Sequence, residues 1–174
     1  MRKEAGEMKA DENKDQAPKS VRFAVITISD TKTDLDDNSG KAIAGLMEQK
    51  GHLCMRKVIV KDDAAEIQQA LREIIEDQRV QAIVMSGGTG ISKRDITLDA
   101  VARFEERPLP GFGELFRALS YREIGSAAIM SRACAFVSEG KVVFCLPGSE
   151  KAVTLAVSQL IAPELGHIVW EANR

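Results

Sequence analysis

The sequence has 174 residues, of which 44% are hydrophobic and 29% charged, and its formal net charge is -2. A chain of this length and composition is long enough for one domain with a sizeable core. It lacks the basic excess typical of proteins that bind nucleic acids, so we expect no nucleic-acid partner. The cysteines stand singly, without a CxxC pair, which favours buried thiols in a reducing cytoplasm over disulfides or a zinc site.

Residues 1–20 combine basic and acidic side chains with almost no large apolar ones. Such a segment cannot bury enough surface to offset its conformational entropy, so we predict a disordered leader over 1–20 and a single domain over 21–174. No hydrophobic segment follows the basic start, and no run approaches the length of a membrane span. We therefore expect no secretory signal, no membrane and a cytoplasmic location.

Short apolar runs alternate with helical patterns from residue 21 onward. Residues 21–29, "VRFAVITIS", have the nearly continuous apolar composition of a strand covered on both faces. Residues 39–51 place apolar side chains at helical spacing and end on Gly51, which suits a helix C-cap. A second strand is predicted over 52–60. The helix predicted after it has its apolar stripe at Ile67, Leu71, Ile74 and Ile75.

The second half of the chain continues the alternation with weaker signals. Residues 80–86, "VQAIVMS", predict a third strand. A weaker helical segment follows around residues 99–104. Residues 107–125 predict a turn with a short helix.

A hairpin and a helix close the pattern. Segment 132–146 predicts two strands joined by a turn at Glu139 and Gly140, which implies an antiparallel edge in an otherwise parallel sheet. The last helix has an apolar stripe over 153–161. Pro163 interrupts this stripe, and a shorter closing helix is expected after it.

This alternation predicts an α/β domain built as a three-layer α/β/α sandwich, with a mostly parallel sheet. In such sheets, ligands bind beyond the carboxyl ends of the strands. Small and polar residues follow four of the predicted strands, which core packing alone does not require. These exit segments are "SDTKTDLDDNSG" from Ser29, "KDD" from Lys61, "SGGTGISKRDIT" from Ser86 and "PGSEKA" from Pro147.

The exit segments have the composition of a phosphate site. Glycines let backbone N–H groups approach a phosphate, and a helix N-terminus adds partial positive charge. Lys93, Arg94 and Lys151 can supply countercharge, while Asp62 and Asp95 can hold one Mg²⁺ together with waters and substrate phosphates. Neither the Walker A pattern nor GxGxxG fits the glycine-rich segment. The residues therefore predict phosphate chemistry with a metal, without a common nucleotide fingerprint.

Simpler explanations remain open for each of these features. The glycine-rich turn can be a tight connection between a strand and a helix. Asp95 or Thr97 can be the N-cap of the next helix, and Asp62 and Asp63 can simply open the helix at residue 64. The acidic run 34–37 is expected to be a solvated loop. The two histidines lack partner spacing and are expected to be surface or satisfied core residues: His52 and His167.

Three segments together resemble the molybdenum cofactor biosynthesis proteins MoaB and MogA, and specifically the MoaB branch. The segments are "SGGTGISKRDIT", "PGFGELFRALSYREIGSAAIMSRA" and "LPGSEKAV". They occur in the family's order and spacing, and the resemblance extends from Val21 to the C-terminal helix. It implies a MogA-like fold and the activity of a molybdopterin adenylyltransferase.

In that family, Mg-ATP and molybdopterin are the substrates. The terminal phosphate of molybdopterin attacks the α-phosphorus of ATP, and pyrophosphate leaves. Matching by motif, the resemblance implies that Asp62 and Asp95 are the catalytic and Mg²⁺-binding residues. It implies that the nucleotide and pterin pockets are lined by Ser29, Asp30, Ser86, Gly87, Gly88, Thr89, Gly90, Arg94, Thr97, Pro147, Gly148, Ser149 and Lys151.

The resemblance also implies partners. The family forms trimers or hexamers, and a downstream molybdenum-insertion enzyme is a further expected partner. The apolar residues expected at a subunit interface are Phe112, Leu115, Phe116 and Leu119. Three alternatives to the adenylyltransferase stay open: a catalytically silent protein that only carries molybdopterin, a structural scaffold, and a different nucleotide enzyme on the same fold.

Overall fold

The computed structural model describes residues 16–174, so most of the predicted leader lies outside the described residues. The last residues of that leader, 17–20, lie against the domain. The Ser20 hydroxyl donates a 2.6 Å hydrogen bond to the Gly51 carbonyl oxygen. The ordered chain therefore begins a few residues before the predicted boundary at residue 21.

A mixed sheet of six strands forms the middle layer, in the order β2-β1-β3-β6-β5-β4. β1, β2, β3 and β6 are parallel, and β5 is antiparallel to both of its neighbours. The predicted antiparallel edge is therefore confirmed, and its outermost strand is the short β4, which pairs with β5. The strands are β1 (Arg22–Ile28), β2 (Leu53–Val60), β3 (Ala82–Ser86), β4 (Arg107–Pro108), β5 (Cys134–Ser138) and β6 (Lys141–Leu146).

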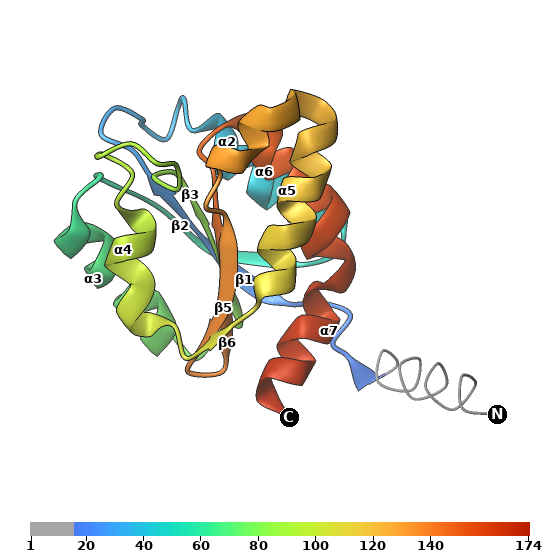
Figure 1. The fold of residues 1–174 in the computed structure, drawn as a ribbon. Coiled ribbons are helices and arrows are strands. Elements are labelled where there is room, and N and C mark those ends of the chain that lie inside the picture. Colours follow the sequence, from blue (N-terminus) through green and yellow to red (C-terminus); the bar gives the residue numbers. More distant parts are fainter. Residues whose placement is uncertain (1–15) are drawn as a thin grey trace.

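Helices cover both faces of this sheet, which confirms the predicted three-layer α/β/α arrangement (Figure 1). One face carries α2, α5, α6 and α7, and the other carries α3 and α4. The stripe predicted for α3 is fully buried against the sheet. The helices are α2 (Asn38–Gln49), α3 (Ala64–Glu76), α4 (Thr97–Val101), α5 (Pro110–Ile124), α6 (Glu150–Ala156) and α7 (Ala162–Asn173).

Helix α5 differs from the short helix that was predicted, since it runs for 15 residues. Pro110 stands in its first turn, where a missing N–H costs nothing. The Phe112 ring packs edge-on against Phe144 at 5.2 Å between centroids, and Phe116 is buried. Phe116 is therefore a core residue and not the exposed interface residue that was expected, whereas Phe112 is partly buried against the core.

The interruption predicted at Pro163 is also wrong, because the chain stays helical from Glu150 to Asn173. A π-helical turn over Val157–Ile161 joins α6 to α7, and the Ala162 N–H bonds the Val157 carbonyl oxygen five residues back. This wider turn accommodates the proline, which lacks an N–H for the regular ladder.

The joined helix corrects a second expectation, since it is long and apolar enough to cross a membrane, with a mean hydropathy of 1.4. The sequence analysis had identified no such run. In the structure its apolar stripe packs on the sheet: Val153, Val157 and Leu165 have no exposed surface. Burial against the core accounts for the apolar composition of this helix.

Lys141, at the start of β6, is a buried lysine that ties the sheet to the end of α3. Its ammonium donates to the carbonyl oxygens of Asp77 at 2.7 Å and Val80 at 2.6 Å. Burial lowers the pKa of this lysine, while the nearby Asp77 carboxylate acts in the opposite direction.

Replacing Lys141 by methionine should keep the packing of the side-chain stem and leave these carbonyl groups without a donor. We expect the free energy of unfolding to fall by about 1 to 3 kcal/mol. Urea denaturation followed by circular dichroism measures the change. Lys57→Met, at an exposed position, is the matched control and should change stability by less than about 0.5 kcal/mol. Equal stability of the two variants would show that Lys141 does not hold α3.

Candidate functional site

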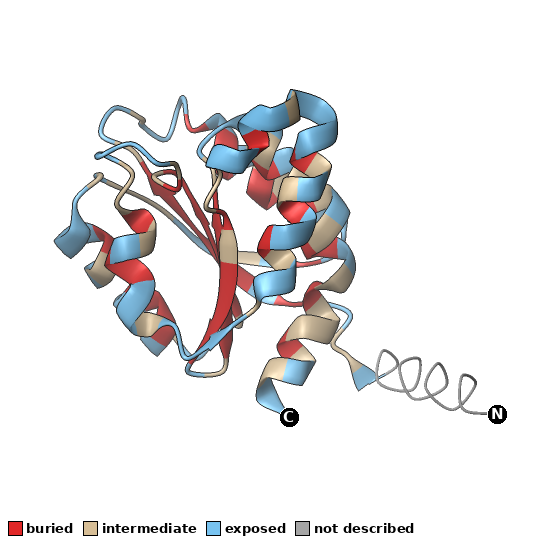
Figure 2. Cartoon of the chain, viewed as in Figure 1, coloured by how far each residue is buried: buried red, intermediate tan, exposed pale blue. Residues whose placement is uncertain are grey.

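The four predicted exit segments meet at one edge of the sheet, beyond the carboxyl ends of the parallel strands. The Gly87 N–H bonds the Leu146 carbonyl oxygen at 3.0 Å, and the Ser29 N–H bonds that of Val60 at 2.9 Å. Figure 2 shows buried strands below this edge and largely exposed loops above it. The predicted convergence of the exits is therefore confirmed by geometry.

The glycine-rich segment passes the ends of β1 and α4 so closely that it has no room for side chains. Gly87 and Gly88 have φ angles of +116° and +64°, which L residues rarely adopt. A Cβ on Gly87 would collide with the Ile28 carbonyl oxygen, and one on Gly88 would collide with the Thr97 hydroxyl. The glycines are therefore required by the close approach of the backbone at this connection.

Thr97 is the clamp on the inner side. Its buried hydroxyl donates to the Gly87 carbonyl oxygen at 2.8 Å, and its N–H donates to that of Gly88 at 3.1 Å. The N-cap position of α4 is Ile96, without a side-chain cap, so the alternative that Asp95 or Thr97 caps this helix is wrong. Thr97 positions the loop and does not offer its hydroxyl to a pocket.

Asp95 closes the turn after the glycines. Its Oδ2 accepts a 2.8 Å hydrogen bond from the Ser92 N–H. A Cβ on Gly90 would lie 2.7 Å from this same oxygen, so the carboxylate faces the bare backbone of the loop.

Arg132 fixes the same turn and was missed in the sequence analysis. Its Nε donates to the Gly90 carbonyl oxygen at 2.8 Å, and its Nη2 donates to that of Asp95 at 2.6 Å. Its backbone N–H bonds the Thr89 carbonyl oxygen at 3.1 Å. No local pattern marks this arginine, because its three acceptors are backbone oxygens about 40 residues earlier in the chain.

Three aspartates from separate loops share the rim. Asp30 accepts from the Asp62 N–H at 3.1 Å and from Arg94 Nη2 at 2.8 Å, and these bonds lower its pKa. Burial raises the pKa of Asp62, and the charges of Asp30 and Asp95 raise it further. The ionised form of Asp62 is therefore disfavoured, and a bound cation would stabilise it.

The neighbouring Asp63 has a different role. It caps α3 by accepting from the N–H groups of Ala65 at 2.9 Å and Glu66 at 3.0 Å. The helix-opening explanation is thus confirmed for Asp63. It is wrong for Asp62, whose side chain takes no part in that cap.

Three buried side-chain oxygens in the described part of the chain have no hydrogen-bond partner: Asp62 Oδ1, Ser86 Oγ and Thr89 Oγ1. All three were candidate site residues: Asp62 follows β2, and Ser86 and Thr89 lie at the end of β3, which β1 separates from β2 in the sheet. Leaving a buried polar group unpaired costs about 1 to 3 kcal/mol each. Unpaired groups gathered at one place indicate a polar ligand that would satisfy them.

The acidic run 34–37 is not wholly the solvated loop that was expected, because Asp37 is buried and organises the rim. Its carboxylate accepts from the Thr27 hydroxyl at 2.8 Å and from the Gly40 N–H at 2.9 Å, which caps α2. Lys32 Nζ lies 3.8 Å from Asp37 and donates to Ser39 at 2.8 Å. This network fixes the loop after β1 against the start of α2.

Two other predicted site residues, Ser29 and Ser149, accept hydrogen bonds from nearby backbone N–H groups. The Ser29 hydroxyl accepts from the N–H groups of Thr31 at 3.3 Å and Lys32 at 3.2 Å. The Ser149 hydroxyl caps α6 by accepting from the Ala152 N–H at 3.3 Å. Both hydroxyls shape the backbone of the rim.

A cavity of about 230 Å³ opens beside the loop. It combines hydroxyl groups with apolar walls, as expected for a planar ring with a polar edge. Lys151 does not line this cavity. It lies on a separate hollow with Glu123 and Glu150, so the structure does not bring it to the other candidates. The residues lining the cavity include Thr89, Phe116, Ser120, Met130, Pro147 and Ser149.

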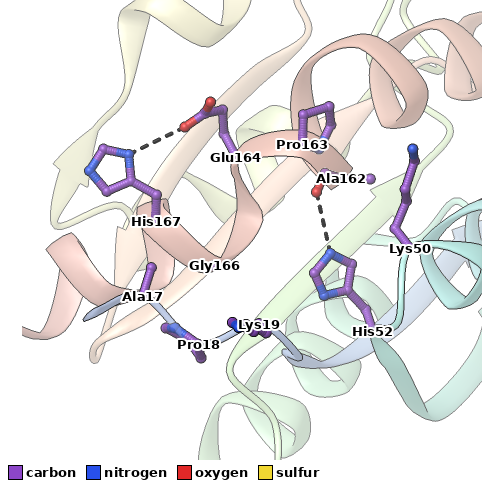
Figure 3. Close-up of a pocket in the computed structure, with 10 residues that line it drawn as sticks. All are labelled: Ala17, Pro18, Lys19, Lys50, His52, Ala162, Pro163, Glu164, Gly166 and His167. Atoms are coloured by element: carbon purple, nitrogen blue, oxygen red, sulfur yellow. Dashed lines mark hydrogen bonds and ion pairs between the residues drawn. The ribbon is translucent and has the colours of Figure 1, made fainter. Parts of the chain in front are cut away.

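A cavity of about 340 Å³ at the amino end of the strands is a poorer candidate (Figure 3). Its His52 ring accepts from the Val21 N–H at 3.2 Å and pairs with the Ala162 carbonyl oxygen at 3.3 Å. His167 pairs with Glu164 at 3.2 Å. Both histidines are thus satisfied, as predicted, and ligands of parallel sheets bind at the opposite edge.

Known proteins resemble this chain over most of its length. A family model described as "Probable molybdopterin binding domain" matches residues 24–167. Molybdenum cofactor biosynthesis protein B of Bacillus cereus is 48% identical over 168 residues, which are 96% of this chain and 99% of the relative. The Bacillus subtilis protein of the same name is 47% identical over the same shares.

Solved structures agree as well. A crystal structure of molybdenum cofactor biosynthesis protein B matches with a TM-score of 0.87 at 48% identity, over 91% of this chain and 99% of that one. MoaB from Pyrococcus furiosus, described as a tungsten cofactor synthesizing protein, matches with a TM-score of 0.83 at 38% identity, over 91% and 100%. The chain therefore belongs to the MoaB family of molybdenum cofactor biosynthesis proteins.

Proposed function

We propose that this protein transfers the adenylyl group of Mg-ATP to molybdopterin and releases pyrophosphate. The observation that carries the proposal is the set of unpaired buried oxygens on Asp62, Ser86 and Thr89, which lie at a glycine loop that has no room for side chains. Backbone N–H groups and hydroxyls of this kind suit phosphate oxygens, and the carboxylate suits a metal ion.

Asp62 and Asp95 fit the role of magnesium ligands. The first presents an unpaired Oδ1 beside Gly88, and the second faces Gly90 across the same loop. In the part of the chain that the structure describes, no group of three or more metal-ligating side chains occurs. This suits Mg²⁺, which usually takes one or two carboxylates and completes its shell with waters and phosphates. The ion would neutralise charge on the triphosphate.

The protein's own contribution is positioning and charge. An oxygen of the molybdopterin phosphate forms a bond to the α-phosphorus of ATP, and the bond from that phosphorus to the pyrophosphate oxygen breaks. The attacking phosphate is already an anion, so no side chain has to remove a proton. Loop N–H groups hold the phosphates, and Arg94, held by Asp30, offers its guanidinium at the rim.

The cavity beside the loop suits the ring system of one substrate. Its apolar walls, such as Phe116 and Met130, favour a flat heterocycle, and its hydroxyls can bond the polar edge of that ring. The reacting phosphate would then lie over Thr89, which lines the cavity and belongs to the glycine loop. Ring recognition and phosphate binding would then lie next to each other.

Asparagine at position 62 tests the role of the carboxylate. Asp62→Asn should lower pyrophosphate release with Mg-ATP and molybdopterin by about a hundredfold or more, because it removes the metal ligand and keeps the shape. Asp63→Asn is the control from the next position. Asparagine is as good an N-cap as aspartate, so its rate should stay within about twofold of the native protein. Full turnover by Asp62→Asn would contradict the proposal.

The raised pKa of Asp62 predicts that the same substitution, Asp62→Asn, increases stability although it lowers activity. Because the pKa is raised in the folded state, folding disfavours the ionised carboxylate. This cost is absent below the unfolded pKa, about 3.9, and complete above the folded pKa. Without metal, Asp62→Asn should therefore be more stable than the native protein at pH 7 and equally stable at pH 3. Thermal unfolding at both pH values measures this, and a loss at pH 7 would argue against strain at Asp62.

One surface of the described residues suits the homo-oligomer expected of the family. Exposed apolar side chains, including the predicted Leu115, lie on α5 and on the following 3-10 turn over Gly125–Met130, which favours a homo-oligomeric contact there. Its members are Leu115, Tyr121, Ile124, Ile129 and Met130.

Light scattering should give a mass above that of the 19.0 kDa chain. Ile129 is 85% exposed, so a glutamate in its place cannot harm the core and should shift the protein to monomers. Leu35→Glu, at an equally exposed loop position outside the patch, should leave the mass unchanged. A native monomer would contradict this surface as a subunit contact.

A further inference from the structure

Two cysteines face each other on the hairpin that ends beside the glycine loop. The strand register pairs Cys134 of β5 with Cys145 of β6. Directly opposed residues of an antiparallel pair project to the same face of the sheet. Both thiols are free in the structure. The proposed adenylyl transfer uses neither of them.

The pair lies at a hydrogen-bonded position of the ladder. On the other side of β5, the carbonyl oxygens of Ala135 and Val137 accept bonds from the β4 region, from Leu109 at 2.8 Å and Glu106 at 3.1 Å. The alternate residues of β5, Cys134 among them, therefore bond β6. Opposed Cβ atoms in a hydrogen-bonded pair are about 5.5 Å apart, whereas a disulfide needs about 3.5 to 4.5 Å.

The two thiols differ in accessibility and in acidity. Cys134 is half-buried and lines a cavity of about 210 Å³ at the sheet edge, together with Arg117 and Arg132. A hydrogen bond from Cys145 lowers the pKa of the Cys134 thiol, and the two arginines act in the same direction. The hydrogen bond to Cys134 and complete burial raise the pKa of Cys145. Cys134 is thus both the more acidic and the more accessible of the two thiols, as is typical of reactive cysteines.

Both cysteines are close in sequence to groups that hold the glycine loop. Arg132, two positions before Cys134, donates to the carbonyl oxygens of Gly90 and Asp95. Leu146, directly after Cys145, accepts the Gly87 N–H. Drawing the strands together at the cysteines would therefore shift both anchors of the loop.

We propose that Cys134 and Cys145 form a reversible redox modification site, in which a disulfide across the hairpin loosens the glycine loop. The oxidant is a low-molecular-weight disulfide. The Cys134 thiolate attacks one of its sulfurs, the sulfur–sulfur bond breaks, and one thiolate leaves. Cys145 gives its proton to that thiolate and attacks the Cys134 sulfur, and the second thiolate leaves with the proton that Cys134 lost. The protein dithiol is oxidised by two electrons, and the small disulfide is reduced to two thiols.

The full chain treated with glutathione disulfide tests the site without reference to catalysis. Free thiols are alkylated, and peptide mass spectrometry should find a bridge between Cys134 and Cys145. The bridge should be absent from Cys134→Ser and Cys145→Ala and should persist in Cys54→Ser, the matched control for the remaining cysteine. Because Cys134 is only half-buried, its serine variant keeps the test valid if the Cys145 variant does not fold.

Amide hydrogen exchange of the native protein before and after oxidation tests the coupling. The bridge should speed exchange over residues 87–95 by at least about threefold, and a reductant should restore the original rate. Oxidation confined to Cys54, or no bridge in folded protein, would overturn the site. A bridge with unchanged exchange over 87–95 would overturn its effect on the loop. Neither result bears on whether the protein adenylylates molybdopterin.

Discussion

The close passage of the backbone at Gly87 and Gly88 is the constraint on which the site depends. These residues run between the end of β1 and the start of α4 with no space for a side chain on the inner side. Thr97 holds the loop from one side, and Arg132 holds its far end. A loop held in this way suits phosphate binding, because it does not first have to be ordered.

The same edge of the sheet carries buried polar groups that cost stability. Asp62, Ser86 and Thr89 bury oxygens that no protein group satisfies, and Asp62 carries its charge beside two further carboxylates. A core selected only for stability would pair or exclude these groups. The surrounding network is, in contrast, fully bonded: Asp37 alone joins Thr27, Ser39 and Gly40. In the described residues, the unsatisfied groups thus lie at the strand exits, where the proposed function would bind substrate phosphates and a cation.

Much of this arrangement could be predicted from the sequence, because its signals are local. Apolar runs alternating with helical stripes predicted the layers, and the polar residues after each strand predicted the edge at which the site lies. Long-range partners could not be predicted. Arg132 bonds backbone oxygens, which leave no mark in the sequence. Asp37 looked like one more acid in a loop until the fold brought Thr27 beside it.

Local rules also failed where tertiary packing overrode them. A proline within an apolar stripe usually ends a helix, but burial against the sheet keeps the chain helical through a π-helical turn at Val157–Ile161. Lys151 belongs to a motif that the resemblance placed in the site, yet the turn of α6 directs it to another hollow. Both outcomes depend on tertiary contacts, which no short sequence window contains.

The central claim is that this site joins an adenylyl group to molybdopterin. The measurement that tests it most directly is pyrophosphate release by the native protein from Mg-ATP, with and without molybdopterin. The account predicts release only when molybdopterin is present, with one adenylylated product formed for each pyrophosphate. Molybdopterin binding without any release would show a carrier protein. Release that does not depend on molybdopterin would show a different nucleotide enzyme. Either result would contradict the account.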